Sequence, residues 1–218
     1  MEIRQSLIDK SKYSLKCPNK LDVKYIVVHN TANDASAENE IAYMKSTNVS
    51  TSFHFAVDDK EAVQGIPLER NAWHAGDGAN GKGNRHGIGI EICYSKSGGE
   101  RFLQAERNAA KLIAYLLKKY ELDISAVITH QMCSGKYCPH RTLAIGWDRF
   151  IDMIKNELGG EKMGTRYRNI GEVPEWGKAT IQKLINKGYL AGTGNSLDLS
   201  LDMIRVFVIN DKAGVYDD

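Results

Sequence analysis

The stretch KYIVVHNT, residues 24–31, decides the fold class expected for this chain. A short run of β-branched and other apolar residues, followed at once by polar ones, predicts a buried strand that ends near His29. GIGIEICYS, residues 87–95, predicts a second buried strand, and SAVITH, residues 125–130, predicts a third. Residues 105–120 place apolar side chains along one helical face. Strands that alternate with helices predict an α/β fold, in which helices flank a central sheet.

Three further stretches fit the same plan. ASAENEIAYMKS, residues 35–46, and GWDRFIDMIKNEL, residues 146–158, are typical of helices, and two glycines end the second one. SFHFAVDDKEAVQGIP, residues 52–67, predicts a strand, a turn and a second short strand. We therefore expect one domain over residues 1–158, which is large enough to hold a catalytic site. A linker over 159–163 and a small module over 164–218 follow it.

Composition limits the classes of function. The chain has 218 residues, 42% hydrophobic and 26% charged, which is ordinary for a globular protein. A net charge of +2 is too mild to indicate nucleic-acid binding. No apolar run approaches the ~20 residues of a membrane span, and MEIRQSLIDK is unlike a signal peptide. We expect synthesis in the cytoplasm and neither a nucleic-acid nor a membrane partner.

The stretch HQMCSGKYCPHR, residues 130–141, holds two histidines, two cysteines, a lysine and an arginine. Its two cysteines are not spaced as a C-x-x-C redox pair. His130 ends a predicted strand, as His29 does, so adjacent strands would bring both rings to one sheet edge. Two histidines with the Cys138 thiolate would leave tetrahedral zinc a free position for water. Histidines satisfied within the core are the alternative, and the coincidence of two strand-terminal histidines beside a cysteine favours the metal.

The first part of the chain resembles a known family. The matching stretches are KYIVVHNTANDASAENEIAYM, SFHFAVDDKEAVQGIPLERNAW, GIGIEICYSKSGG and THQMCSGKYCPHR. In this order they resemble the zinc-dependent N-acetylmuramoyl-L-alanine amidases of the type-2 family, especially phage endolysins and autolysins. The resemblance implies a mixed sheet flanked by helices, as in peptidoglycan-recognition proteins, with one zinc on His29, His130 and Cys138. It also implies cleavage of the amide between N-acetylmuramic acid and L-alanine, and hence lysis of the bacterial wall.

That chemistry needs a base and a donor for the developing oxyanion. Glu91 is the candidate base, because the isoleucines around it face the other way and a carboxylate in a central strand is costly without a task. A salt bridge to Arg85 or Lys136 is the alternative explanation. The resemblance places Lys136 in the cleft as the second catalytic residue. A non-catalytic muropeptide-binding protein on the same fold is the rival function, and the presence of Cys138 argues against it.

Other polar residues are candidates for substrate contact. They are His54, His74, Trp73 and Asn30. Some family members carry a tyrosine donor where this chain has Phe53. We therefore expect catalysis in this chain to depend more on Glu91. Asn30 is also a candidate to orient the first zinc ligand, His29, without contacting the metal itself.

The module at 164–218 resembles, over a short stretch, helical modules appended to cell-wall amidases. Residues 173–188 predict a helix with Pro174 in its first turn, and Met203 to Ile209 suit a buried helix or a buried strand equally. This segment is apolar on nearly every face, so we expect the module to self-associate or to bind the wall. If the gene is phage-encoded, a holin-type route would release the protein to the wall.

Overall fold

The computed structural model describes residues 2–159, 166–190 and 196–217. The chain divides into two compact units, Met1–Gly160 and Glu161–Asp218. Apart from Gly159, the linker predicted at 159–163 lies outside the described residues.

Six strands of the first unit form one mixed sheet in the described part of the chain. In chain order they are β1 (Glu2–Gln5), β2 (Tyr25–Asn30), β3 (Phe55–Val57), β4 (Glu61–Gln64), β5 (Gly87–Ile92) and β6 (Val127–Thr129). Their spatial order is β1-β4-β3-β5-β2-β6. β3 and β4 are antiparallel, as the predicted strand–turn–strand requires, and the other pairs are parallel. The α/β prediction is therefore confirmed, whereas the edge strand β1 was not predicted.

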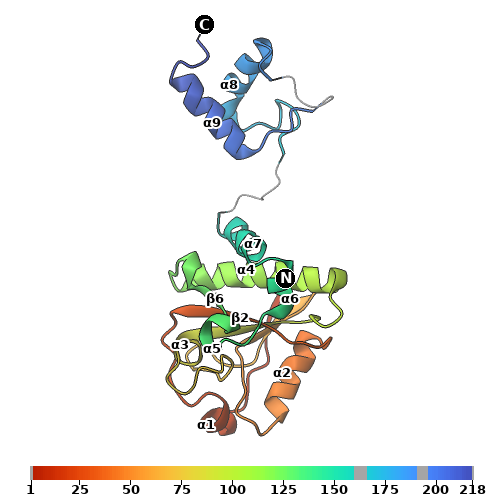
Figure 1. Ribbon diagram of the computed structural model, residues 1–218, viewed down its shortest axis with the longest axis vertical. Helices are drawn as coiled ribbons and strands as arrows, with labels where there is room; N and C mark the ends of the chain where they lie inside the picture. The colour runs from red at the N-terminus through yellow and green to blue at the C-terminus, as the bar shows by residue number, and fades with distance from the viewer. Residues whose placement is uncertain (1, 160–165, 191–195, 218) are drawn as a thin grey trace. The chain divides into compact units, whose positions relative to one another are not determined.

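Helices cover both faces of this sheet. The described helices of the unit are α1 (Tyr13–Lys16), α2 (Ala37–Ser46), α3 (Lys82–His86), α4 (Gly99–Lys119), α5 (His130–Ser134), α6 (His140–Ile145) and α7 (Trp147–Gly159), with short 3₁₀ turns at Lys10–Lys12 and Ile124–Ala126. The long α4 lies across one face with α7 packed against it, and α2 lies on the opposite face (Figure 1). No helix in the described ranges is both long and apolar enough to cross a membrane.

The core follows from the alternation seen in the sequence. Ile88, Ile90 and Ile92 of β5 are fully buried, and Glu91 between them is half-buried. The helical stripe predicted over 105–120 is buried within α4, for example at Leu112 and Leu116. The helix begins at Gly99, six residues before the apolar stripe.

In the residues of the second unit that the structure describes, two helices, α8 (Glu175–Asn186) and α9 (Leu201–Lys212), pack together. Its buried core contains Val173, Ile181, Leu199 and Ile204. The segment that suited helix or strand forms α9, and Ser200 caps it by accepting a hydrogen bond from the Met203 backbone N–H.

Candidate functional site

Two adjacent strands deliver two histidines to one edge of the sheet. β2 pairs in parallel with β6, with Val28 opposite Thr129. His29 is therefore near the end of its strand while His130 directly follows its own, at the first position of α5. Thr129 caps α5 by accepting from the Met132 N–H. The two Nδ1 atoms lie 3.0 Å apart, and both rings are buried.

Cys138 reaches this pair from the segment between α5 and α6. Its Sγ lies 4.0 Å from His29 Nδ1 and accepts a hydrogen bond from the Asn30 backbone N–H at 3.5 Å. The Asn30 side chain holds the segment that follows: its Oδ1 accepts from the N–H groups of Arg141 and Thr142. Asn30 is thus engaged with the protein, and because it also lines the cleft beside Glu91, its substrate contact stays a prediction.

The three side chains fit a transition metal ion. One ligand atom from each of His29, His130 and Cys138 lies within 4.8 Å of the others. Tetrahedral zinc with bonds of about 2.0–2.3 Å to nitrogen and sulfur requires ligand atoms at separations of this order. Two imidazoles and a thiolate are also the borderline-soft donors that zinc prefers over magnesium or calcium.

Glu91 lies beside this cluster with one carboxylate oxygen that has no hydrogen-bond partner. β2 and β5 are neighbours, and His29 is in register with Glu91. Glu91 Oε1 lies 4.0 Å from His29 Nδ1, and its buried Oε2 has no hydrogen-bond partner. In the described residues no ion pair joins Glu91 to Arg85 or Lys136, which argues against the salt-bridge explanation. A buried carboxylate oxygen left free next to three metal-type ligands is a candidate for proton transfer.

Burial dominates the electrostatics of the cluster. Desolvation raises the pKa of Glu91 to about 8; Glu40 adds to this rise and Lys136 opposes it. Desolvation also raises the pKa of the Cys138 thiol to about 11. For His29, burial and the neighbouring rings of His74 and His130 hold the pKa well below its ordinary value. Without a cation, the site therefore favours neutral side chains.

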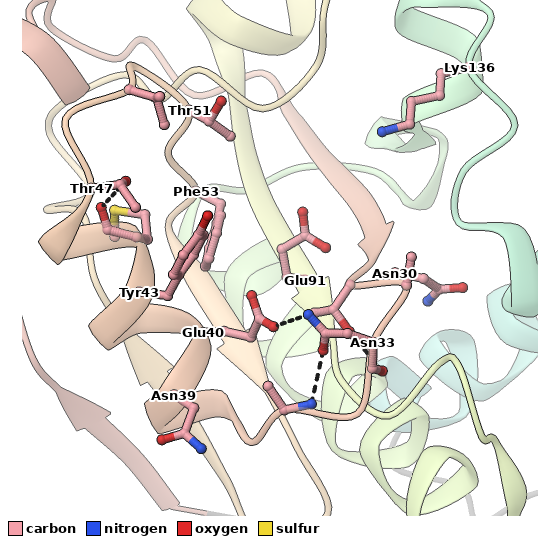
Figure 2. Close-up of a pocket in the computed structure, with 15 residues that line it drawn as sticks. Asn30, Asn33, Asn39, Glu40, Tyr43, Thr47, Thr51, Phe53, Glu91 and Lys136 are labelled. Carbon is pink, nitrogen blue, oxygen red and sulfur yellow. Dashed lines mark hydrogen bonds between the residues drawn. The ribbon is translucent and has the colours of Figure 1, made fainter.

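A cleft of about 560 Å³ opens beside Glu91. Lys136 extends into it from the segment after α5, and Glu91 points into it from β5 (Figure 2). The opposite wall comes from α2 and the loops on either side of it. Its lining includes Asn33, Asn39, Glu40, Tyr43, Thr47, Thr51 and Phe53. Sequence reasoning missed the α2 residues, because no motif in ASAENEIAYMKS, residues 35–46, marked them.

The remaining predicted contact residues lie behind the cluster or beside it. His54 is fully buried; its Nε2 donates to Arg70 O and its Nδ1 accepts from the Gly89 N–H, so neither nitrogen is left for a ligand. His74 is buried against His29 and the backbone of β5. Trp73 is half-buried and exchanges hydrogen bonds through its backbone with Ser52. None of these three is among the residues that line the cleft.

Comparisons with known proteins agree with this arrangement. Residues 19–141, more than half of the chain, match the family model described as N-acetylmuramoyl-L-alanine amidase. The chain is 57% identical over 165 residues to the N-acetylmuramoyl-L-alanine amidase CwlA of Bacillus subtilis (strain 168), covering 75% of this chain and 60% of that protein. Against the amidase XlyB of the same organism it is 57% identical over 159 residues, covering 72% and 50%.

A solved structure is equally similar. The structure of PlyL shares 57% sequence identity with this chain at a TM-score of 0.69, covering 71% of this chain and 97% of that chain. Against the two curated relatives, however, the chain spans only 60% and 50% of their lengths.

Proposed function

This chain belongs to the N-acetylmuramoyl-L-alanine amidase family, and from that premise we propose that it hydrolyses the amide between N-acetylmuramic acid and the L-alanine of the peptidoglycan stem peptide. The proposal depends on one observation above all: two imidazoles, a thiol and a carboxylate with one unpartnered oxygen meet at the edge of a cleft. A protein that only bound muropeptides would have no need for a free buried carboxylate beside a metal-type ligand set. The resulting function is lysis of the bacterial cell wall.

We assign one Zn²⁺ to His29, His130 and Cys138. Bound there, zinc supplies Lewis acidity toward the amide carbonyl and lowers the pKa of a water toward ~7. Glu91 would be ionised beside a cation, because an opposite charge within a few ångströms favours the carboxylate. Its free Oε2 then accepts a proton from the attacking water and delivers that proton to the nitrogen of the departing L-alanine.

Lys136 is assigned to the carbonyl side of the reaction. Its ammonium group donates hydrogen bonds and offsets the negative charge that develops on the amide oxygen. Phe53 lines the cleft where a tyrosine would offer a further donor, so Lys136 and the metal site provide this stabilisation without it.

The test is digestion of purified peptidoglycan with two products measured in parallel. Cleavage at the proposed bond releases L-alanine amino groups and creates no new reducing ends, whereas a glycosidase does the opposite. Chelation should abolish the release and added zinc should restore it. Reducing ends in place of amino groups, or full lysis by metal-free protein, would show that the assignment is wrong.

For the second unit we propose self-association through α9 and attachment to the wall. Met203, Val206 and Ile209 are exposed at intervals of three residues along this helix. An exposed apolar stripe of this kind marks an interface. Paired units would also raise avidity on a repetitive polymer, because the second contact becomes intramolecular.

A further inference from the structure

A line of hydrogen bonds leads from the metal cluster into the sheet. His29 Nε2 lies 3.0 Å from His74 Nδ1, and His74 Nε2 lies 3.2 Å from the carbonyl oxygen of Gly87. All of these atoms are buried. The line leaves His29 on the side opposite to the Nδ1 that faces His130 and Cys138.

The protonation of each ring in this line can be deduced. A carbonyl oxygen only accepts, so the nitrogen of His74 next to Gly87 must be the one that carries hydrogen. A neutral imidazole has a single N–H, which makes His74 Nδ1 an acceptor. The hydrogen between the two rings therefore belongs to His29 Nε2. His29 then keeps an unprotonated Nδ1, the atom that lies in the metal cluster.

His130 is not fixed by the same line of hydrogen bonds. Its Nε2 lies 3.3 Å from the point that a Cβ on Gly76 would occupy. Its Nδ1 lies 3.0 Å from His29 Nδ1, and because His29 Nδ1 carries no hydrogen, the hydrogen in this contact belongs to His130 in the metal-free chain.

We propose that His74 is a positioning residue that sets the ligand histidine His29 in the tautomer with a free Nδ1. The proposal deepens the assigned zinc site and rests on it. Partners of this kind behind a ligand histidine fix the ring and typically change metal affinity by 10–100-fold. The role differs from the substrate contact expected of His74 from the sequence.

Two independent features of the fold hold His74 in this position. The Asn84 side chain of α3 is buried, and its Oδ1 accepts from the backbone N–H of His74 and of Ala75, at 2.9 and 2.8 Å. Gly89 in the middle of β5 makes room for the ring, because a Cβ there would lie 2.7 Å from two carbon atoms of His74. A glycine inside a central strand costs stability, and such a close approach is a reason for it.

The first test reads the tautomers directly in the metal-free chain. Two-bond ¹H–¹⁵N spectra of the ¹⁵N-histidine protein at about pH 8, above the ordinary histidine pKa of ~6.5, distinguish protonated from bare ring nitrogens. We expect His29 with hydrogen on Nε2 and a bare Nδ1. In His74→Leu that preference should be lost, because the acceptor is gone. A wild-type His29 protonated on Nδ1 would overturn the proposal.

The second test measures zinc affinity by competition with a chelating dye. His74→Leu should bind zinc about 10–100-fold more weakly. His74→Asn should recover most of the affinity, because its amide oxygen can occupy the place of Nδ1. Gly89→Ala keeps His74 but displaces its ring, and should weaken binding in the same direction. His86→Gln, a half-exposed histidine away from the cluster, is the matched control and should bind zinc as wild type does.

These outcomes separate the proposal from its premise. A wild-type chain that binds no zinc would refute the assigned metal site, while the tautomer spectra would still decide the role of His74. Zinc binding and His29 tautomer that are both unchanged in His74→Leu would refute the positioning role alone. If His74→Leu fails to fold by circular dichroism, His74→Asn and Gly89→Ala decide the question: equal affinities in these two variants would count against it.

Discussion

At the residue scale, Glu91 separates proton transfer from metal binding. Glu91→Gln preserves the shape of the side chain and removes the proton acceptor. We expect about one zinc per chain to remain and turnover to fall by roughly 10²-fold or more, the usual scale for a general base. Metal analysis and peptidoglycan digestion measure the two quantities. Loss of zinc, or turnover at the wild-type level, would contradict the assignment.

Lys136→Ala tests whether Lys136 stabilises the negative charge that develops on the amide oxygen. Lys136 is exposed, so its removal should leave the free energy of unfolding nearly unchanged. Turnover should fall to an extent similar to that of the Glu91 variant. Turnover at the wild-type level would show that Lys136 takes no part in the reaction.

The buried Cys138 thiol makes zinc affinity depend on pH. Its pKa of about 11 keeps it protonated near neutrality, whereas zinc binds the thiolate. Binding must therefore release a proton from Cys138. It must release a second one from Glu91, because a pKa of about 8 keeps that carboxyl mostly protonated in the metal-free chain and the cation ionises it. The Kd should fall about 100-fold per unit as pH rises from about 6 to 7, below both pKa values. Burial holds the pKa of His29 low, so this ring adds no proton in that range. Calorimetry in two buffers of different ionisation enthalpy should give about two protons per zinc; an affinity independent of pH would contradict this.

At the element scale, α4 and α7 are joined by an ion pair with one fully buried partner. Glu106 is 0% exposed, and its Oε2 accepts from Arg149 Nη2 at 2.5 Å. Arg149→Met would leave a buried carboxylate unpaired. We expect a loss of about 3 kcal/mol, the lower end of the range for a broken buried pair, because the Arg149 side chain is 35% exposed.

The double variant Glu106→Leu/Arg149→Met is the control for this pair. It removes both charges, so most of the lost stability should return. Urea denaturation measures both variants. A double variant as unstable as the single one would mean that packing, and not the unpaired charge, causes the loss.

At the scale of the whole molecule, the exposed stripe of α9 predicts an oligomer. Light scattering coupled to size exclusion should find a dimer or a larger species for the full chain. Ile209→Lys should give a monomer, because this side chain, at 65% exposed, is the most exposed of the three in the stripe. Lys212→Gln, at the exposed end of the same helix, should not change the size.

A chain that ends near Leu158 should be a monomer that keeps its zinc. The similar structure of PlyL covers 71% of this chain. A full chain that remains monomeric at micromolar concentration would contradict self-association and leave wall attachment as the proposed role of the second unit.

Local patterns in the sequence determined the elements and some of their faces. The alternation around Glu91 depends only on the pleat of one strand, and the stripe of α4 only on the pitch of one helix. The resemblance supplied the rest of the candidate site, including Lys136. The prediction that His29 and His130 meet required one long-range assumption, that their strands are neighbours, and the β2–β6 pairing confirms that assumption.

Tertiary structure decided what each polar side chain touches. Spacing along the chain cannot reveal that His54 and His74 turn inward, that Asn30 holds the segment after Cys138, or that Gly89 makes room for a ring, because the partners are 10 to more than 100 residues away in sequence. The choice of helix for Met203 to Ile209 also depended on packing, since a run that is apolar at every position except Arg205 suits both periods. Contacts between residues far apart in the sequence determine which side chains are buried and which atoms hydrogen-bond. The tertiary structure therefore decides these features, and local sequence patterns do not.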